Sequence, residues 1–220
     1  MPVVRPPFLK PIKDKASLVG SEISPTSTKS RQRDYTLVLD LDETLIHYVD
    51  VDSDTEESYF LIRPFCKQFL KELSHFYEIV IFTAGVEEYA NWVVDQLDPD
   101  GSMISQRLYR QHTINRSKTQ PLPLIIKDLS KIGRPLERTI IVDNIADNFI
   151  LQKDNGIFIK TWYSDKNDKA LRDLIPLLKQ FVEHEVKDVR LSLRRFRDEM
   201  ARMISDGSHK KQEQSLNLKH

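Results

Sequence analysis

Two carboxylates that directly follow a short apolar run are the residues of this sequence best suited to chemistry. Asp40 and Asp42 come immediately after the apolar run Leu37–Leu39, and Thr44 adds a hydroxyl group beside them. Carboxylates are almost never fully buried without partners, so a buried strand that ends in such a pair indicates a functional site. In that site the two carboxylates could act as metal ligands, as a nucleophile or as a general acid.

Two later apolar runs end in the same way. The run that begins at Glu78 ends at Thr83, and the run that begins at Thr139 ends at Asp143 and Asn144. Continuous runs rich in Val and Ile are typical of parallel strands that are buried on both faces. Because ligands bind beyond the carboxyl ends of such strands, we expect the polar groups of all three strand ends to share one crevice.

Helical patterns separate these apolar runs. One apolar stripe at helical spacing consists of Cys66, Phe69, Leu70 and Leu73. Since Cys66 lies on this stripe, we expect a core residue rather than a reactive thiol. Further helical patterns cover residues 86–97 and the region from 168 onward. Strands that alternate with helices predict an α/β fold, with a central parallel sheet flanked by helices.

Composition and charge exclude several classes of protein. The chain has 220 residues, of which 40% are hydrophobic and 30% are charged, so it can bury a sizeable core. A formal net charge of zero gives no overall attraction to nucleic acid or to an anionic membrane. The single cysteine cannot form an internal disulfide, which suits a reducing compartment.

The sequence also lacks membrane and export signals. No apolar run approaches the roughly 20 residues of a membrane-spanning helix, and the N-terminus lacks the apolar segment of a signal peptide. We therefore expect an intracellular protein of the cytoplasm or the nucleus, which associates with a membrane only through an anchor or a partner outside this chain.

The sequence divides into three regions. Residues 1–33 contain several prolines and a Ser/Thr/Lys-rich run, which predicts a disordered arm. Residues 34–185 contain the strand and helix patterns and should form the main domain. Residues 186–220 predict an amphipathic helix and a disordered tail. A solvated face is the default interpretation of that helix, and the alternative is a docking surface for a regulatory protein or an anionic lipid.

The chemistry of the strand ends favours a particular cofactor and substrate. Carboxylate-rich sites without His or Cys ligands favour Mg²⁺, and phosphate esters suit Mg²⁺ combined with a lysine. Lys127 ends another apolar run and could supply that lysine. An aspartate nucleophile would form an aspartyl phosphate. A second aspartate could protonate the leaving oxygen and then activate water, which is worth roughly 10²–10⁴-fold.

Four motifs occur in an order that resembles one known family. Asp40-Leu-Asp-Glu-Thr-Leu45 matches the Asp-x-Asp-x-Thr signature of haloacid-dehalogenase-type phosphatases. The other three motifs are Phe82-Thr-Ala84, Lys127-Asp-Leu-Ser130 and Val142-Asp-Asn144. Together they are similar to the small C-terminal-domain phosphatases (Fcp/Scp, NIF-like). Tyr109–His112 and Ile159–Asp165 resemble the Dullard (nuclear-envelope phosphatase) subgroup.

The resemblance implies a Rossmann-like haloacid-dehalogenase fold without a large cap domain, and a Mg²⁺-dependent protein serine/threonine phosphatase. The implied catalytic residues are Asp40 (nucleophile), Asp42 (general acid and base), Thr44 (orientation of the loop), and Thr83 and Lys127 (phosphoryl oxygens). The implied Mg²⁺ ligands are Asp40, Asp42 through its backbone carbonyl, Asp143 and Asn144. The implied substrate-binding residues are Leu41, Thr83, Arg110 and Lys127.

Some features depart from the family's pattern. Ile145-Ala146 stands where the family often has Ser-Pro, and Gly85 replaces the serine of Thr-Ala-Ser. The stretch Asp50–Glu57 is acidic and lacks the apolar insert that recognises proline in polymerase-tail phosphatases. Such an acidic rim would favour basic phosphopeptides by electrostatic complementarity.

The short segments between the motifs leave no room for a large lid domain. An open site favours a phosphorylated protein over a small metabolite that needs enclosure. Two alternatives stay open: a non-catalytic phosphoprotein-binding module on the same fold, and a small-molecule phosphatase. The presence of both Asp40 and Asp42 argues against the binding module, and the absence of a strongly basic groove argues against a nucleic-acid substrate.

Overall fold

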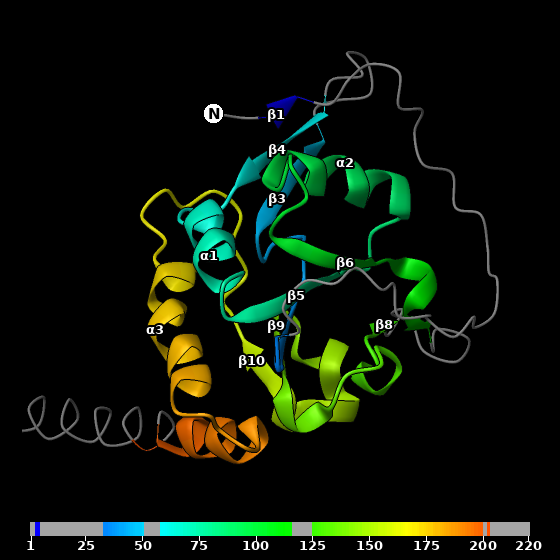
Figure 1. The fold of residues 1–220 in the computed structure, drawn as a ribbon. Helices are drawn as coiled ribbons and strands as arrows, with labels where there is room; N and C mark the ends of the chain where they lie inside the picture. Colours follow the sequence, from blue (N-terminus) through cyan, green and yellow to red (C-terminus); the bar gives the residue numbers. More distant parts are fainter. Residues whose placement is uncertain (1–2, 5–32, 51–57, 116–124, 200–201, 203–220) are drawn as a thin grey trace, which may run out of the picture.

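A five-stranded parallel sheet forms the centre of the protein in the computed structural model, which describes residues 3–4, 33–50, 58–115, 125–199 and 202 (Figure 1). In hydrogen-bonding order its strands are β10 (Gly156–Phe158), β9 (Thr139–Asp143), β2 (Tyr35–Leu39), β5 (Tyr77–Phe82) and β6 (Ile104–Leu108). The three apolar runs of the sequence are the three central strands, so the prediction of a buried parallel sheet is confirmed.

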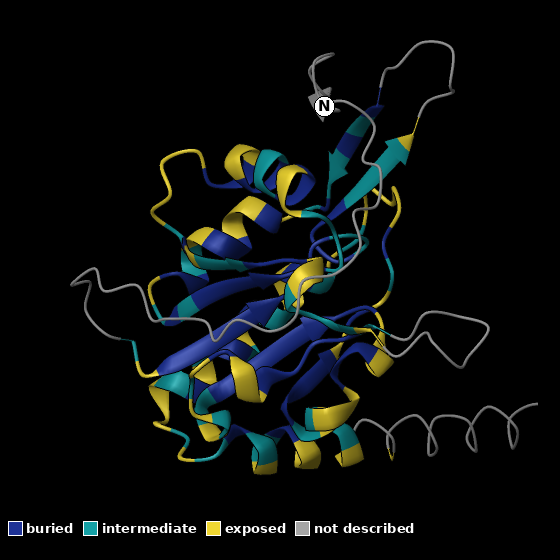
Figure 2. Cartoon of the chain, turned by 90° about the vertical axis from the view of Figure 1, so that its right-hand side faces the viewer, coloured by how far each residue is buried: buried dark blue, intermediate teal, exposed yellow. Residues whose placement is uncertain are grey.

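Successive residues of the central strands face opposite sides of the sheet. Leu37 and Leu39 of β2 belong to the larger apolar core, whereas Val38 belongs to a smaller core on the other face. The strands β5 and β9 alternate in the same way. Figure 2 shows these strands as buried along their length. Apolar side chains therefore cover both faces, which is the usual condition for a parallel sheet.

Three α-helices contribute buried side chains to the larger core. They are α1 (Cys66–Leu73), α2 (Glu87–Leu97) and α3 (Ala170–Glu183). The stripe predicted on α1 is buried, and Cys66 lies within it. Burial raises the pKa of the Cys66 thiol to about 12, as expected for a core residue. The helix α3 continues past Pro176, with Ile175 and Leu178 buried on either side of the proline.

A small antiparallel sheet stands next to the central one. It contains β1 (Val3–Val4), β4 (Ser58–Ile62) and β3 (Ile46–Asp50), with β4 in the middle. The sequence predicted a disordered arm at residues 1–33, but the backbone of Val3–Val4 pairs with β4. Apart from residue 33, the rest of the arm lies outside the described residues.

Short elements connect the sheet to the helices. They are η1 (Arg110–His112), β7 (Ile114–Asn115), β8 (Ile125–Ile126), η2 (Leu129–Lys131), η3 (Leu136–Arg138) and η4 (Ala146–Asn155). The strands β7 and β8 pair with each other, so the apolar run before Lys127 lies outside the central sheet. Side chains from η2 and η4 complete the smaller core.

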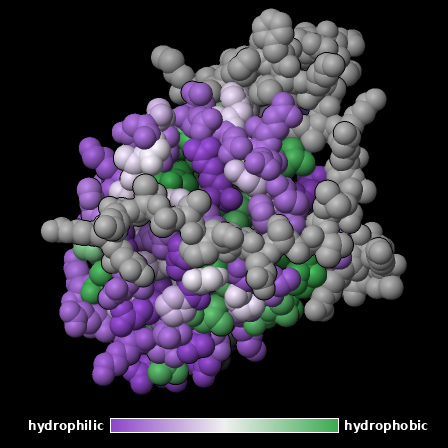
Figure 3. Space-filling model, turned by 45° about the vertical axis from the view of Figure 1, so that its right-hand side comes forward, coloured by the Kyte–Doolittle hydropathy of each residue, from purple (hydrophilic) through white to green (hydrophobic). Residues whose placement is uncertain are grey.

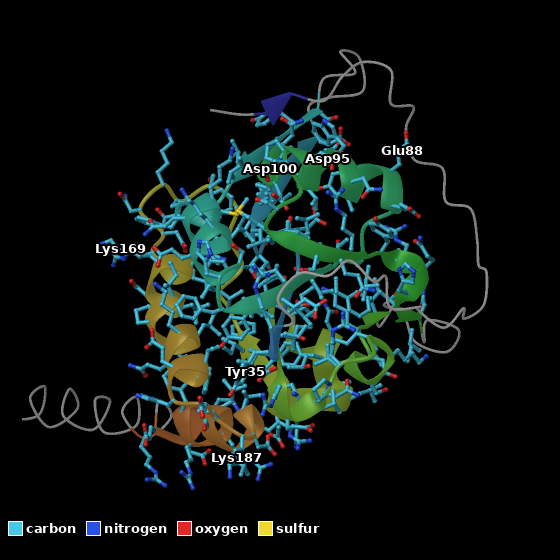
Figure 4. The ribbon with its side chains drawn as sticks, viewed as in Figure 1. Tyr35, Glu88, Asp95, Asp100, Lys169 and Lys187 are labelled. Atoms are coloured by element: carbon cyan, nitrogen blue, oxygen red, sulfur yellow. The ribbon has the colours of Figure 1, made fainter. Side chains whose placement is uncertain are left out.

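A final helix covers residues 189–199. Its Val189 and Leu193 are buried in the larger core, so the predicted division after residue 185 does not separate two packing units. The Tyr35 hydroxyl donates a 2.8 Å hydrogen bond to the carbonyl oxygen of Val186 just before this helix, and Figure 4 shows Tyr35 and Lys187 at the same end of the molecule. A docking role therefore stays a prediction for the outward side of the helix alone.

The surface shown in Figure 3 is mostly hydrophilic, with apolar residues in small separate patches. Among the described residues, no helix has the length and apolar character needed to cross a membrane.

Candidate active site

The carboxyl ends of the central strands bring the predicted residues together. Asp40 follows β2, and its backbone N–H donates a 3.0 Å bond to Val142 of β9. Thr83 follows β5, and its backbone N–H donates a 2.9 Å bond to Leu108 of β6. Each polar residue is therefore fixed by the neighbouring strand at the edge where the sheet ends.

Lys127 lies between two carboxylates. Its Nζ is 2.5 Å from Asp40 Oδ1 and 2.6 Å from Asp143 Oδ2, and neither Lys127 nor Asp143 is exposed to solvent. Burial disfavours the charged amine, but the two carboxylates outweigh burial and raise the pKa of Lys127. The two carboxylates therefore favour the charged form of Lys127.

The second oxygen of Asp40 and the amide oxygen of Asn144 have a common neighbour. Thr44 Oγ1 lies 2.9 Å from Asp40 Oδ2 and 3.3 Å from Asn144 Oδ1, so both oxygens lie next to one hydroxyl group. Burial raises the pKa of Asp40 to about 7, against the attraction of Lys127. A carboxylate in this setting gains from a further cation.

The side chain of Asp42 instead contacts Tyr89 of α2 and Thr83. The Tyr89 hydroxyl donates a hydrogen bond to Asp42 Oδ1, and Thr83 Oγ1 donates one to Asp42 Oδ2 at 3.3 Å. Burial raises the pKa of Asp42, while both hydrogen bonds lower it. A raised pKa suits a carboxyl group that must deliver a proton.

Sequence reasoning missed Tyr89. It lies in the first turn of α2, and its signal is a polar group on the same helix face as the apolar Val93. Gly85 makes room for it, because a Cβ atom at that position would lie 3.1 Å from Tyr89 Cδ1 and 3.2 Å from Thr83 Oγ1. The departure from Thr-Ala-Ser thus accompanies the close approach of Tyr89.

Asn148 is a second residue that sequence reasoning missed. Its Nδ2 lies 3.1 Å from both carboxylate oxygens of Asp143. Its backbone carbonyl oxygen accepts a 2.7 Å hydrogen bond from the backbone N–H of Lys127. The backbone N–H of Ile145 also donates to Asp143 Oδ1, at 2.8 Å. Asp143 is therefore surrounded by donors, and only the spacing of five residues from Asp143 to Asn148 hinted at this contact.

Two of the predicted substrate-binding residues, Leu41 and Arg110, differ in where their side chains lie. The side chain of Leu41 is fully buried in the larger core, so substrate binding by Leu41 stays a prediction for its main chain alone. Arg110 lies at the rim, where its Nε donates a 2.7 Å bond to the carbonyl oxygen of Ala84. The acidic stretch predicted to select basic peptides lies, apart from Asp50, outside the described residues.

The donor set around Asp40 fits Mg²⁺. Mg²⁺ keeps several waters and takes one or two carboxylates, so Asp40 Oδ2 and Asn144 Oδ1 are suitable ligands. Asp143 instead directs its oxygens at Lys127 and Asn148. Accordingly, no group of three acidic, His or Cys side chains in the described part of the chain could surround one ion. That Asp143 and the backbone carbonyl of Asp42 also bind Mg²⁺ stays a prediction, since the Asp143 oxygens meet Lys127 and Asn148 here.

Comparison with known proteins indicates the same family as the sequence motifs. The family model of NLI interacting factor-like phosphatases matches residues 35–190. The chain is 40% identical over 171 residues to the probable C-terminal domain small phosphatase of Dictyostelium discoideum, covering 72% of this chain and 53% of that protein. It is 31% identical over 191 residues to carboxy-terminal domain RNA polymerase II polypeptide A small phosphatase 2 of Homo sapiens, covering 81% and 68%.

Among solved structures, that of the fission yeast RNA polymerase II CTD phosphatase Fcp1 bound to beryllium fluoride has a TM-score of 0.46 and 20% identity, and covers 80% of this chain and 56% of that one. The chain spans about half of the length of its Dictyostelium relative. Because the family model matches most of the described core and the human relative aligns with four fifths of the chain, this protein belongs to the family of NLI interacting factor-like phosphatases, the homologues of the small C-terminal-domain phosphatases.

Proposed function

We propose that this protein is a Mg²⁺-dependent phosphatase that hydrolyses phosphoserine and phosphothreonine in proteins through an aspartyl phosphate. The observation that carries the proposal is the position of Lys127 Nζ, 2.5 Å from Asp40 Oδ1 at the carboxyl edge of the sheet. A buried cation beside a nucleophilic carboxylate is suited to a phosphoryl group, because it offsets the negative charge that would otherwise repel the attack.

In the first step, a carboxylate oxygen of Asp40 attacks phosphorus, and the bond between phosphorus and the seryl or threonyl oxygen breaks. Asp42 donates its proton to that oxygen, so the alcohol leaves as a neutral group. The contact of Asp42 with Tyr89 and Thr83 fixes the position of the proton donor. Thr83 and Lys127 would contact the phosphoryl oxygens.

In the second step, Asp42 accepts a proton from water, and the water oxygen attacks phosphorus. The bond between phosphorus and the Asp40 oxygen breaks, which releases inorganic phosphate and restores both side chains. When bound, Mg²⁺ would supply positive charge to the phosphoryl group, and Asp40, Asp143, Asn144 and the backbone carbonyl of Asp42 would hold it.

A protein substrate fits the site better than a small metabolite. In the described ranges, no separate cap domain covers the carboxyl edge of the sheet. An enclosed metabolite site needs such a cover, whereas a phosphorylated side chain on a protein can enter an open site. Arg110 would contact the peptide from the rim, and the acidic stretch of the sequence would favour basic peptides.

The test is hydrolysis of an aryl phosphate with and without Mg²⁺, followed by a panel of phosphopeptides and small phosphate esters. We expect Mg²⁺-dependent turnover that falls by about 10²–10⁴-fold in Asp40→Asn and in Asp42→Asn. Asp100→Asn, in an exposed turn after α2, is the matched control and should keep full activity. A wild type that binds Mg²⁺ but hydrolyses no phosphoester contradicts the proposal and favours a binding module. Faster turnover of small esters than of any phosphopeptide favours a small-molecule phosphatase.

A further inference from the structure

Arg63 is a buried cation that the proposed mechanism does not use. It follows β4 and is 1% exposed. Its guanidinium donates to the two carboxylate oxygens of Asp168 at 2.8 and 2.9 Å, to the carbonyl oxygen of Thr44 at 3.1 Å and to the carbonyl oxygen of Lys160 at 3.0 Å. A desolvated guanidinium is costly unless its charge and its donors are satisfied, and here a carboxylate pairs with the charge and four of the five N–H groups have acceptors.

The carbonyl groups of Thr44 and Lys160 belong to two segments, and each segment contacts one end of the Asn144 side-chain amide. Thr44 Oγ1 lies 3.3 Å from Asn144 Oδ1. Thr161, directly after Lys160, accepts the Asn144 Nδ2 donor at 3.3 Å. Arg63 therefore bridges the segments that orient this amide, and its position sets the distance between them.

A second contact joins the same two segments. The backbone N–H of Trp162 donates a 2.9 Å bond to the carbonyl oxygen of Glu43, next to Thr44. The loop of the nucleophile and the loop after β10 are thus tied together twice, once by backbone and once by Arg63. Since Thr44 also contacts Asp40 Oδ2 at 2.9 Å, movement between the loops would separate the two oxygens suited to a cation.

Asp168 fixes the direction of the guanidinium. Its Oδ1 accepts from Arg63 Nε and also from the backbone N–H of Ala170 at 3.1 Å, at the end of α3 that Lys169 marks in Figure 4. The planar fork of an arginine reaches a carboxylate and two carbonyl groups at once, which the single ammonium of a lysine cannot do.

We propose that Arg63, oriented by Asp168, is a positioning residue for the divalent-cation site. It acts through Thr44 and Lys160 and keeps the oxygens of Asp40 and Asn144 directed at one point. The inference rests on the proposed function, because that function requires the cation. It assigns a role in catalysis to a residue that touches neither the substrate nor the cation.

The test compares Arg63→Lys with a matched control, Arg134→Lys. Arg134 forms a similar two-bond pair with Glu78, at 2.7 and 2.5 Å, at the start of β5 and away from Thr83. Mg²⁺ affinity is measured by isothermal titration calorimetry, and kcat and KM are measured with an aryl phosphate at saturating Mg²⁺. We expect Arg63→Lys to bind Mg²⁺ about 10–100-fold more weakly and to lose kcat by a similar factor, with little change in KM. Arg134→Lys should match the wild type in all three.

Asp168→Asn is the second test variant, and it replaces Arg63→Lys if that variant does not fold. In that variant Arg63 keeps its two carbonyl contacts, so we expect a smaller loss of Mg²⁺ affinity, of roughly 10-fold. Variants that melt at lower temperature but bind Mg²⁺ and turn over within about two-fold of the wild type would show that Arg63 only stabilises the fold, which overturns the inference. A wild type that neither binds Mg²⁺ nor turns over overturns the proposed function itself.

Discussion

Lys127 Nζ lies 2.6 Å from Asp143 Oδ2, and neither side chain is exposed to solvent. The same nitrogen lies 2.5 Å from Asp40 Oδ1, so two buried carboxylates share one buried ammonium. Buried ion pairs contribute little net stability when complete, but the loss of one member leaves an uncompensated charge. The consequences for stability and for activity can therefore be measured separately.

Lys127→Met should be strongly destabilising. Its removal leaves Asp40 and Asp143 buried without their cation, and breaking such a pair costs about 3–5 kcal/mol in the free energy of unfolding. Denaturant unfolding at pH 7 measures this loss. Lys131→Met, an exposed lysine of η2, is the control and should change stability by less than about 0.5 kcal/mol. A Lys127→Met loss below about 1 kcal/mol would contradict the ion-pair geometry.

Asp40→Asn should stabilise the metal-free protein at high pH. Burial raises the pKa of Asp40 from its usual range to about 7, so the folded state binds an extra proton between about pH 4 and pH 7. Wild-type stability should therefore fall as the pH rises through 7, and the neutral Asn lacks this loss. Thermal melts in a chelator at pH 5 and pH 8 measure the effect. At pH 8 we expect a higher Tm for Asp40→Asn, by roughly 2–4 °C. A wild-type Tm that falls no more than that of the variant over this range speaks against the raised pKa.

The central strands, and the polar residues that end them, could be predicted because both are recognisable from short stretches of sequence. A run such as that before Asp143 is apolar throughout and ends abruptly in a polar residue, which identifies a buried strand and its carboxyl end in the same few residues. Leu41 shows the limit of a motif, because it identifies the loop but not the direction of each side chain. The side chain of Leu41 faces the core although both of its neighbours face the site.

Elements that depend on tertiary partners could not be predicted. The edge strand β6 contains Ser105, Gln106 and Arg107, so its sequence is not apolar, and it becomes a strand by pairing with β5. Tyr89 and Arg63 contact partners that lie far from them along the chain, Asp42 and Asp168. Neither has a neighbour in sequence that reveals the contact.

Cys66 should be unreactive in the folded protein. Its side chain is buried in α1, and burial raises its pKa to about 12, so the thiolate that alkylating reagents attack is scarce at pH 8. We expect alkylation of the native protein only after denaturant is added, and full phosphatase activity after treatment under native conditions. Mass spectrometry of the intact protein counts the modification. Rapid labelling together with loss of activity would contradict the core position and would point to a cysteine in the reaction.

The pair of Arg63 and Asp168 should make stability depend on pH in the acid range. The Arg63 guanidinium holds the pKa of Asp168 below its usual value, so the unfolded state binds the proton first as the pH falls. The stabilisation by this pair is therefore fully present above about pH 4 and is lost as the pH falls through the folded-state pKa. Asp168→Asn has no proton to gain, so its deficit relative to the wild type should be about 3 kcal/mol at pH 7 and should shrink below pH 4. Denaturant unfolding at pH 7, 5 and 3.5 measures the difference, and Asp147→Asn controls for the loss of an exposed carboxylate. A deficit that stays constant down to pH 3.5 would show that the Asp168 carboxylate is not held in its charged form by Arg63, and that its contribution comes from packing alone.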